Sequence, residues 1–271
     1  MNLSAADRYF EEALARLRHV HDSQREALDR AADICTEAIA ADGLVHLFGC
    51  GHSRMMCEEM TPRQGCFVGW HTIVELGLTF HNVIVGANGL RQSLHLEKTT
   101  GYAEQILRNF AFGPKDALIV ISTSGIREII IEMALGARER GLRVIGVCSL
   151  EHCRQAKPAH SSGKKLIDVC DVALDNGAPV GDSLLSLDGC RHKTGPFSTV
   201  GGGLLLNMLR CEVARRLIER GVEPVFLPSH QFVGSRTVEE ELEYFYAQYA
   251  RRVAPLFSRQ GEPASRPGVN R

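Results

Sequence analysis

Short apolar segments alternate with helical patterns over most of the chain, and this alternation restricts the fold more than any other feature of the sequence. The apolar segments are 44–48, 116–122, 143–149, 171–175 and 224–227. The helical patterns are 53–63, 125–140, 199–220 and 238–253. Strands that are apolar on both faces are typical of a parallel sheet with helices on both sides. Because crossovers between parallel strands are right-handed, the pattern predicts an α/β fold in three layers, an αβα sandwich.

The N-terminal region predicts a helical unit ahead of the sheet. Apolar residues recur every three or four positions up to residue 41, with polar residues at 21–23. A break there would give a helical hairpin, and no break would give one long helix. We expect a hairpin at 1–41 that contributes to an oligomer interface, an α/β domain at 42–257 and a flexible tail at 258–271. Segment 64–100 is apolar and dotted with glycines, and its pattern gives no clear assignment.

Composition excludes several classes of protein. The formal net charge is −1, which gives no electrostatic argument for nucleic acid or for an anionic membrane surface. No apolar run approaches the roughly 20 residues of a membrane span, and the N-terminus lacks the basic start of a signal peptide. The nine cysteines are odd in number and several lie in apolar segments, so we expect reduced thiols. These features predict a cytoplasmic protein.

Two predicted strand-to-helix turns carry small polar residues. The first turn contains Gly49, Gly51 and Ser53, and the second contains Ser122, Thr123, Ser124 and Gly125. In an open parallel sheet such turns border the crevice beyond the carboxyl ends of the strands, where backbone N–H groups and helix N-termini suit a phosphate. Each turn could equally be a plain glycine turn with a capping serine. Their occurrence on two strands of one sheet favours a phosphate site.

Other ligand motifs are not supported. A dinucleotide fingerprint requires glycine at position 54, which is Arg54, and no Walker motif occurs. Cys50, His52, Cys57 and Cys66 are of the types that bind zinc, but no C-x2-C pair is present. We therefore expect neither a metal ion nor a cofactor.

Three short motifs together resemble those of the sugar isomerase (SIS) domain family. They are "FGCGHS" at 48–53, "VISTSG" at 120–125 and "GLRVIG" at 141–146. The chain is most similar to stand-alone bacterial SIS proteins, with which it shares "SGKKLIDV" at 162–169, "LDNGAPVGDS" at 174–183 and "GPFSTVGG" at 195–202. It also resembles the phosphoheptose isomerases. The resemblance covers roughly residues 5–227.

This resemblance implies a five-stranded parallel sheet that binds a sugar phosphate. In the family, the serine-rich turn holds the phosphate, which carries over to Ser122, Thr123, Ser124 and Gly125, and Ser53 contacts the sugar or the phosphate. Many relatives have threonine where this chain has Arg127, which could hold a phosphate or be solvated. Ser198 and Thr199, in the shared "GPFSTVGG" motif, are further candidates for substrate binding. The resemblance also implies a homodimer or homotetramer with sites near the subunit interface.

Four side chains are candidates for proton transfer. Glu75 lies in the apolar sequence "TIVELG", where burial would raise its pKa towards a useful range, and it ranks first. His52 lies in the expected crevice, and His81 follows the same apolar stretch as Glu75. Glu58 and Glu59 follow Ser53, and one of them aligns loosely with the catalytic glutamate of phosphoheptose isomerases; Glu59 is taken as the candidate. Their catalytic histidine falls near Asn207, so that role does not carry over.

Three functions are compatible with these features. The first is an aldose–ketose isomerase that moves a proton between C1 and C2 of a sugar phosphate. The second is a lyase resembling the N-acetylmuramic acid 6-phosphate etherases, which also have a SIS core. The third is a phosphosugar sensor without catalysis. The chain lacks a helix-turn-helix pattern, which weakens the comparison with sensors fused to DNA-binding domains.

Overall fold

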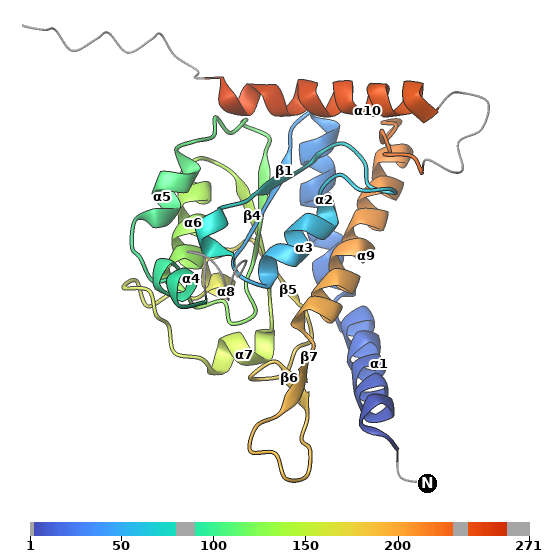
Figure 1. The fold of residues 1–271 in the computed structure, drawn as a ribbon. Helices are drawn as coiled ribbons and strands as arrows, with labels where there is room; N and C mark the ends of the chain where they lie inside the picture. Colours follow the sequence, from blue (N-terminus) through green and yellow to red (C-terminus); the bar gives the residue numbers. More distant parts are fainter. Residues whose placement is uncertain (1–2, 80–89, 230–237, 259–271) are drawn as a thin grey trace, which may run out of the picture.

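The computed structural model describes residues 3–79, 90–229 and 238–258, and Figure 1 shows a central sheet between layers of helices. The strands of this sheet are β1 (Val45–Gly49), β2 (Trp70–Ile73), β3 (Ala117–Ile121), β4 (Arg143–Cys148) and β5 (Val172–Asp175). All neighbouring strands pair in parallel, in the order β2-β1-β3-β4-β5. The predicted α/β sandwich with five parallel strands is confirmed.

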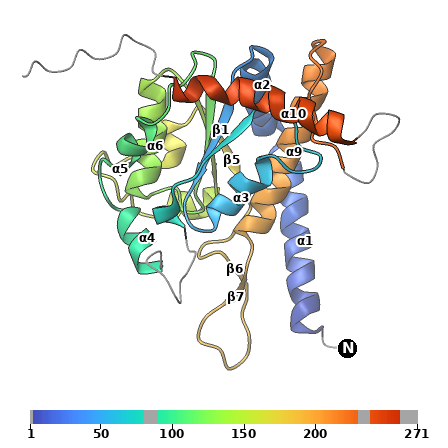
Figure 2. The same ribbon diagram turned by 45° about the horizontal axis from the view of Figure 1, so that its top comes forward.

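Helices cover both faces of the sheet, and a small hairpin lies apart from it. The α-helices are α1 (Ala5–Ser23), α2 (Arg25–Ala40), α3 (Ser53–Met60), α4 (Leu90–Leu96), α5 (Tyr102–Leu107), α6 (Glu128–Glu139), α7 (Leu150–Gln155), α8 (Leu166–Val169), α9 (Ser198–Glu219) and α10 (Val238–Val253). The 3-10 helices are η1 (Leu76–Leu78) and η2 (Ala254–Phe257). The antiparallel strands β6 (Ser183–Leu185) and β7 (Thr194–Pro196) form a hairpin that extends beside α1 in both views (Figures 1 and 2).

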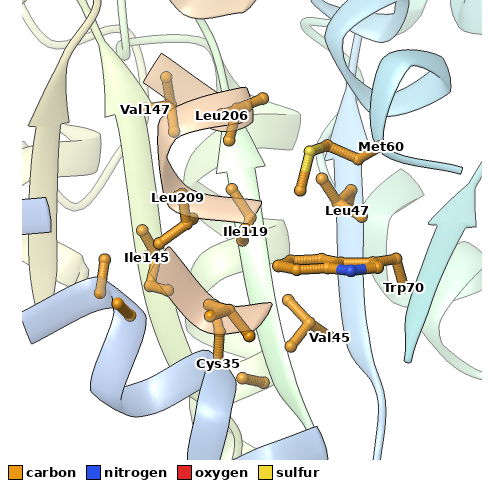
Figure 3. Close-up of a cluster of buried hydrophobic side chains, with 14 of the residues drawn as sticks. Cys35, Val45, Leu47, Met60, Trp70, Ile119, Ile145, Val147, Leu206 and Leu209 are labelled. Atoms are coloured by element: carbon orange, nitrogen blue, oxygen red, sulfur yellow. The ribbon is translucent and has the colours of Figure 1, made fainter. Parts of the chain in front are cut away.

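One face of the sheet packs against α2, α3 and α9. Alternate strand residues point into this core. Figure 3 shows Ile119 and Ile145 beside Leu206 and Leu209 of α9, and Trp70 of β2 lies at the side of this cluster. The intervening residues of the strands, such as Phe48 and Val120, form a second core with α5, α6 and α8. Both cores are almost free of exposed surface, which explains why the strand sequences lack alternation between apolar and polar residues.

The N-terminal region divides into two helices, but they do not fold back on each other as a hairpin. Only Gln24 separates α1 from α2, and its dihedral angles (φ −97°, ψ 4°) stay close to helical values. Its N–H still bonds to Val20 O at 3.1 Å, so the chain kinks without reversing direction. Helix α2 then packs on the sheet, whereas α1 continues past it towards the β6–β7 hairpin (Figure 1).

Segment 64–100, whose sequence pattern gives no clear assignment, supplies one strand of the sheet. Strand β2 lies in this segment and pairs with β1. The expected strand at 224–227 is not part of the sheet. Its residue Phe226 forms an isolated antiparallel bridge with Phe67, supported by a hydrogen bond from Leu227 N to Cys66 O at 2.7 Å. This stretch therefore lies against the approach to β2.

The last helix closes the end of the molecule where the strands begin. Arg252 Nη1 of α10 donates to the carbonyl oxygens of Ile39 and Gly43, both at 3.1 Å, and Arg251 pairs with Asp42. Among the described helices, none is long and apolar enough to cross a membrane. The tail predicted at 258–271 lies, apart from its first residue, outside the described residues.

Candidate functional site

A cavity of about 420 Å³ opens at the carboxyl edge of the sheet. The strand order places β1 and β3 side by side although their connections lead to opposite sides of the sheet. Ligands of doubly wound sheets bind at such a switch point. Both predicted turns contribute to the cavity, and its lining includes Cys50, His52, Ser53, Leu94, Glu97, Ser122, Thr123, Ser124, Arg127, His152, Asp182, Ser198 and Thr199.

The turn after β3 offers free hydrogen-bond donors to the cavity. Ser122 is buried, and its Oγ accepts from Gly125 N at 3.2 Å, which shapes the turn. Gly125 has φ +63°, and a Cβ atom there would lie 2.9 Å from Cys153 Sγ, so glycine is required. Within the described residues, the N–H groups of Thr123 and Ser124 have no acceptor. Together with the hydroxyl groups, they can bind an anion.

The turn after β1 contributes side chains rather than backbone donors. Gly51 N donates to Leu78 O at 2.8 Å and Ser53 N donates to Cys50 O at 3.0 Å, so both N–H groups are already used. Helix α3 begins at Ser53, and the preceding His52 makes no capping bond with its side chain. A Cβ atom on Gly49 would lie 2.9 Å from the backbone of Ser53. The two glycines therefore have a structural role, while His52 and Ser53 line the cavity.

A buried carboxyl group faces the arginine that follows the second turn. Arg127 precedes the first residue of α6, and its Nε lies 3.8 Å from Glu97 Oε2. Glu97 is only 8% exposed, and its carbonyl oxygen accepts from Ile129 N at 3.2 Å. Burial raises the pKa of Glu97, and the Arg127 guanidinium only partly offsets that effect. The cavity thus contains a carboxyl group suited to proton transfer.

Glu97 could not be identified from the sequence. It follows α4 in the polar stretch "HLEKTT", which has the composition of an exposed segment. Only the packing of this stretch against the start of α6 buries the carboxyl group. The charge of Glu97 also acts on Cys50: the pKa of the Cys50 thiol is raised first by burial and second by this charge.

Part of the cavity lining comes from the residue before β6 and from the start of α9. Asp182 Oδ1 accepts from Phe197 N at 3.0 Å and from Ser198 N at 2.7 Å, and Oδ2 accepts from Ser198 Oγ at 2.6 Å. This carboxylate therefore already satisfies the N-terminus of α9. Thr199 and His152 also line the cavity. Asp182 and His152 were not among the predicted site residues, because their separation in sequence hides their proximity.

Two of the acids predicted for proton transfer do not line the cavity. Glu75 is half-buried, and its Oε1 accepts from Gly77 N at 3.1 Å. It also hydrogen-bonds Tyr102, whose pKa rises to about 12 because of burial and then the charge of Glu75. The cavity lining does not include Glu75. His81 lies outside the described residues.

Glu59 belongs to a polar cluster between α3 and α9. It accepts from Asn207 Nδ2 at 3.1 Å and pairs with Arg63. Partial burial opposes ionisation of Glu59, but the hydrogen bonds from Asn207 and Arg63 outweigh it and hold the pKa below its ordinary value. The buried Arg210 donates to Asn207 Oδ1 at 3.2 Å and to the carbonyl oxygen of Glu59. Glu59 is therefore a firmly ionised group in a structural cluster.

The described part of the chain contains no cluster of three or more histidine, cysteine or acidic residues arranged to hold a metal ion. All nine cysteines are free thiols, and most of them are buried in the two cores. The two that precede and lie within α3, Cys50 and Cys57, have raised pKa values caused mainly by burial.

Comparison with known proteins agrees with this architecture. Residues 8–149 match the family model described as the SIS domain. A UPF0309 protein of Brucella anthropi is 36% identical over 236 residues, which cover 87% of this chain and 93% of the relative. A UPF0309 protein of Halalkalibacterium halodurans is 32% identical over 256 residues, with coverage of 94% and 98%.

Among solved structures, the chain is similar in fold to the Vibrio vulnificus NanR protein complexed with ManNAc-6P. The TM-score is 0.50 at 16% sequence identity, and the match covers 92% of this chain and 69% of the NanR chain. At this identity the likeness concerns the fold alone. The family match and the identity to the Brucella anthropi protein carry the assignment: the chain belongs to the SIS domain family.

Proposed function

We propose that the protein binds a sugar phosphate in the cavity at the carboxyl edge of the sheet and isomerises it between aldose and ketose forms. The observation that carries this proposal is the turn after β3. Its residues Ser122, Thr123 and Ser124 line the cavity together with Arg127, and the N–H groups of Thr123 and Ser124 have no acceptor among the described residues. Donors in this arrangement match the oxygens of a phosphate. The NanR protein, which shares the fold, is complexed with the sugar phosphate ManNAc-6P, and this agrees with the assignment.

Proton transfer between C1 and C2 requires a base close to the bound sugar. Glu97 supports this role better than Glu75 or Glu59, because it lines the cavity and burial raises its pKa. His52 and His152 line the same cavity and can exchange a proton with the sugar oxygens. We therefore assign the base to Glu97 and oxygen protonation to one of these histidines. Ser53, Ser198 and Thr199 are the candidate contacts of the sugar hydroxyls.

A ligand screen followed by NMR tests this proposal. We expect one or more aldose or ketose phosphates to raise the melting temperature, and inorganic phosphate to raise it less. Proton NMR in D₂O should then show solvent deuterium entering C1 or C2 of the stabilising sugar. Replacing Ser122 and Ser124 by alanine together should abolish the shift in melting temperature, since both hydroxyls contact the phosphate in the proposed complex.

The outcomes separate the competing functions. Stabilisation without deuterium exchange would contradict isomerisation and leave a phosphosugar sensor. Release of a substituent from the sugar, in place of interconversion of aldose and ketose, would indicate a lyase whether or not deuterium enters C2. Replacement of Glu75 by glutamine is the matched control for Glu97→Gln: exchange should persist in the Glu75 variant and fall at least about 100-fold in the Glu97 variant. Equal loss in both would contradict the assignment of the base.

A further inference from the structure

The guanidinium of Arg127 is shared between two possible partners in the cavity. Arg127 follows Ile126, the residue after the turn that we assign to the phosphate, and Glu97 Oε2 lies 3.8 Å from its Nε. That distance is longer than a charge-assisted hydrogen bond of about 2.7–2.9 Å, so the pair is loose. The Arg127 side chain is 34% exposed, whereas the Glu97 side chain is 11% exposed, so the arginine has more freedom to move.

We infer that the phosphate of the ligand takes Arg127 away from Glu97, and that this exchange of partners prepares Glu97 for proton transfer. The inference rests on the proposed function and adds its regulation: Arg127 acts as a positioning residue that couples phosphate binding to the chemistry. The chemical class of substrate that it predicts is a phosphorylated sugar, since a free sugar would leave Glu97 paired with Arg127.

The chemistry of the two partners favours this exchange. A phosphate dianion carries more charge than a carboxylate and binds guanidinium in a bidentate manner. The free N–H groups of Thr123 and Ser124 would hold the remaining phosphate oxygens at the same time. Glu97, in contrast, keeps its position without Arg127, because the hydrogen bond from Ile129 N to its carbonyl oxygen fixes the backbone.

Loss of the guanidinium changes the charges around Glu97. The groups that face it within the described residues are Lys98 on its own segment, Arg127 and Glu128 at the start of α6, and Cys50 on the turn after β1. Without Arg127, Lys98 is the remaining cation, while Glu128 and the bound dianion both disfavour the carboxylate. Burial already raises the pKa of Glu97, so the exchange raises it further towards neutral pH, where a base is most effective.

Proton uptake on anion binding tests this coupling. Sulfate is the probe, because it imitates a phosphate dianion and does not titrate between pH 5 and pH 7. Calorimetric titration in buffers of different ionisation enthalpy at about pH 5.5 gives the number of protons taken up per sulfate. We expect the wild-type protein to take up a substantial fraction of a proton per site. By reciprocity, its sulfate affinity should rise several-fold, towards about tenfold, between pH 7 and pH 5.

Two variants isolate the contribution of the Arg127–Glu97 pair. In Glu97→Gln, sulfate should bind at least as tightly as in wild type, with proton uptake well below that of wild type. In Arg127→Gln, binding should weaken and uptake should also fall, because Glu97 has no cation to lose. Proton uptake by either variant equal to that of wild type would overturn the inference. Failure of sulfate to bind the wild-type protein would instead overturn the phosphate site and the proposed function with it.

Discussion

His71 shows how a single buried residue gives this fold a dependence on pH. Its Nδ1 lies 2.9 Å from His46 Nδ1, and His46 Nε2 lies 3.2 Å from Asp116 Oδ2. His46 is fully buried, and rings of Phe110 and Phe112 pack edge-on against the two histidines. Burial, then the charge of His46, lowers the pKa of His71 to about 4, and Asp116 offsets only part of this effect.

The lowered pKa predicts acid sensitivity between pH 6.5 and pH 4. In this range the unfolded chain binds a proton at His71 and the folded protein does not. The contribution of His71 to the free energy of unfolding is therefore fully present above the unfolded pKa, and it is lost as the pH decreases towards the folded pKa. The shift corresponds to about 3 kcal/mol in the free energy of unfolding. Urea unfolding at pH 4.5 and pH 7 measures it. His71→Asn should reduce the difference between the two pH values, and an unchanged difference would show that other groups cause it.

At the scale of elements, the packing of α9 depends on glycine at position 201 but not at position 203. A Cβ atom on Gly201 would lie 2.0 Å from the backbone oxygen of Asn176 and 2.7 Å from a ring carbon of Phe197. Gly203, on the same helix, has nothing within 4 Å of such an atom. The sequence "VGGG" therefore contains a required glycine and a dispensable one.

This difference predicts opposite effects of the same substitution. Gly201→Ala should lower the free energy of unfolding by about 1–3 kcal/mol or more, because the backbone of Asn176 cannot move aside without shifting the end of β5. Gly203→Ala should leave it unchanged or raise it by up to about 1 kcal/mol, because alanine favours the helix. Chemical denaturation of both variants at neutral pH decides the matter. Equal changes in the two variants would show that the close contact at Gly201 does not set the cost of a side chain there.

The elements also show which parts of the fold a sequence can reveal. The central strands β3 and β4 were predictable because both faces are buried and their sequences are continuously apolar. Edge strand β2 reads Trp-His-Thr-Ile, with polar residues in the middle, and its identity depends on pairing with β1 rather than on its own pattern. The apolar stretch at 224–227 has the composition of a strand, but its contacts with the segment before β2 leave it outside the sheet.

The candidate site divides in the same way. Residues on the turns after β1 and β3 were predictable, because parallel topology brings the carboxyl ends of these strands together. Glu97, His152 and Asp182 reach the cavity through tertiary packing of segments whose local sequences resemble surface. Glu75 ranked first as a base because its sequence neighbours are apolar, yet its carboxylate hydrogen-bonds Tyr102 and does not line the cavity. Local sequence therefore indicated the strand-end turns but not the acids.

At the scale of the whole molecule, the residues at the two ends of the sheet have different roles. The proposed phosphate turn lies at the carboxyl edge. At the opposite edge, Asp116 accepts from Leu44 N at 2.8 Å and from Gly113 N at 2.6 Å, and it contacts His46. Asp116 is 6% exposed, and its hydrogen bonds tie the starts of β1 and β3 together. Rigid strands separate the two groups of residues, so their effects should be independent.

Asp116→Asn tests this separation against the double replacement of Ser122 and Ser124 by alanine. The asparagine amide would face N–H donors in a buried site, which should lower the free energy of unfolding by about 1–3 kcal/mol for each bond lost. Sulfate affinity of the folded Asp116 variant should stay within about twofold of wild type, because the cavity does not include that residue.

The serine variant should lose sulfate binding and change the free energy of unfolding by less than about 1 kcal/mol, since Ser124 makes no side-chain bond to other described residues and Ser122 makes one. Combining all three substitutions should give additive changes in both measurements. A loss of sulfate affinity in Asp116→Asn at temperatures where it is fully folded would show instead that the two edges of the sheet are coupled through the strands.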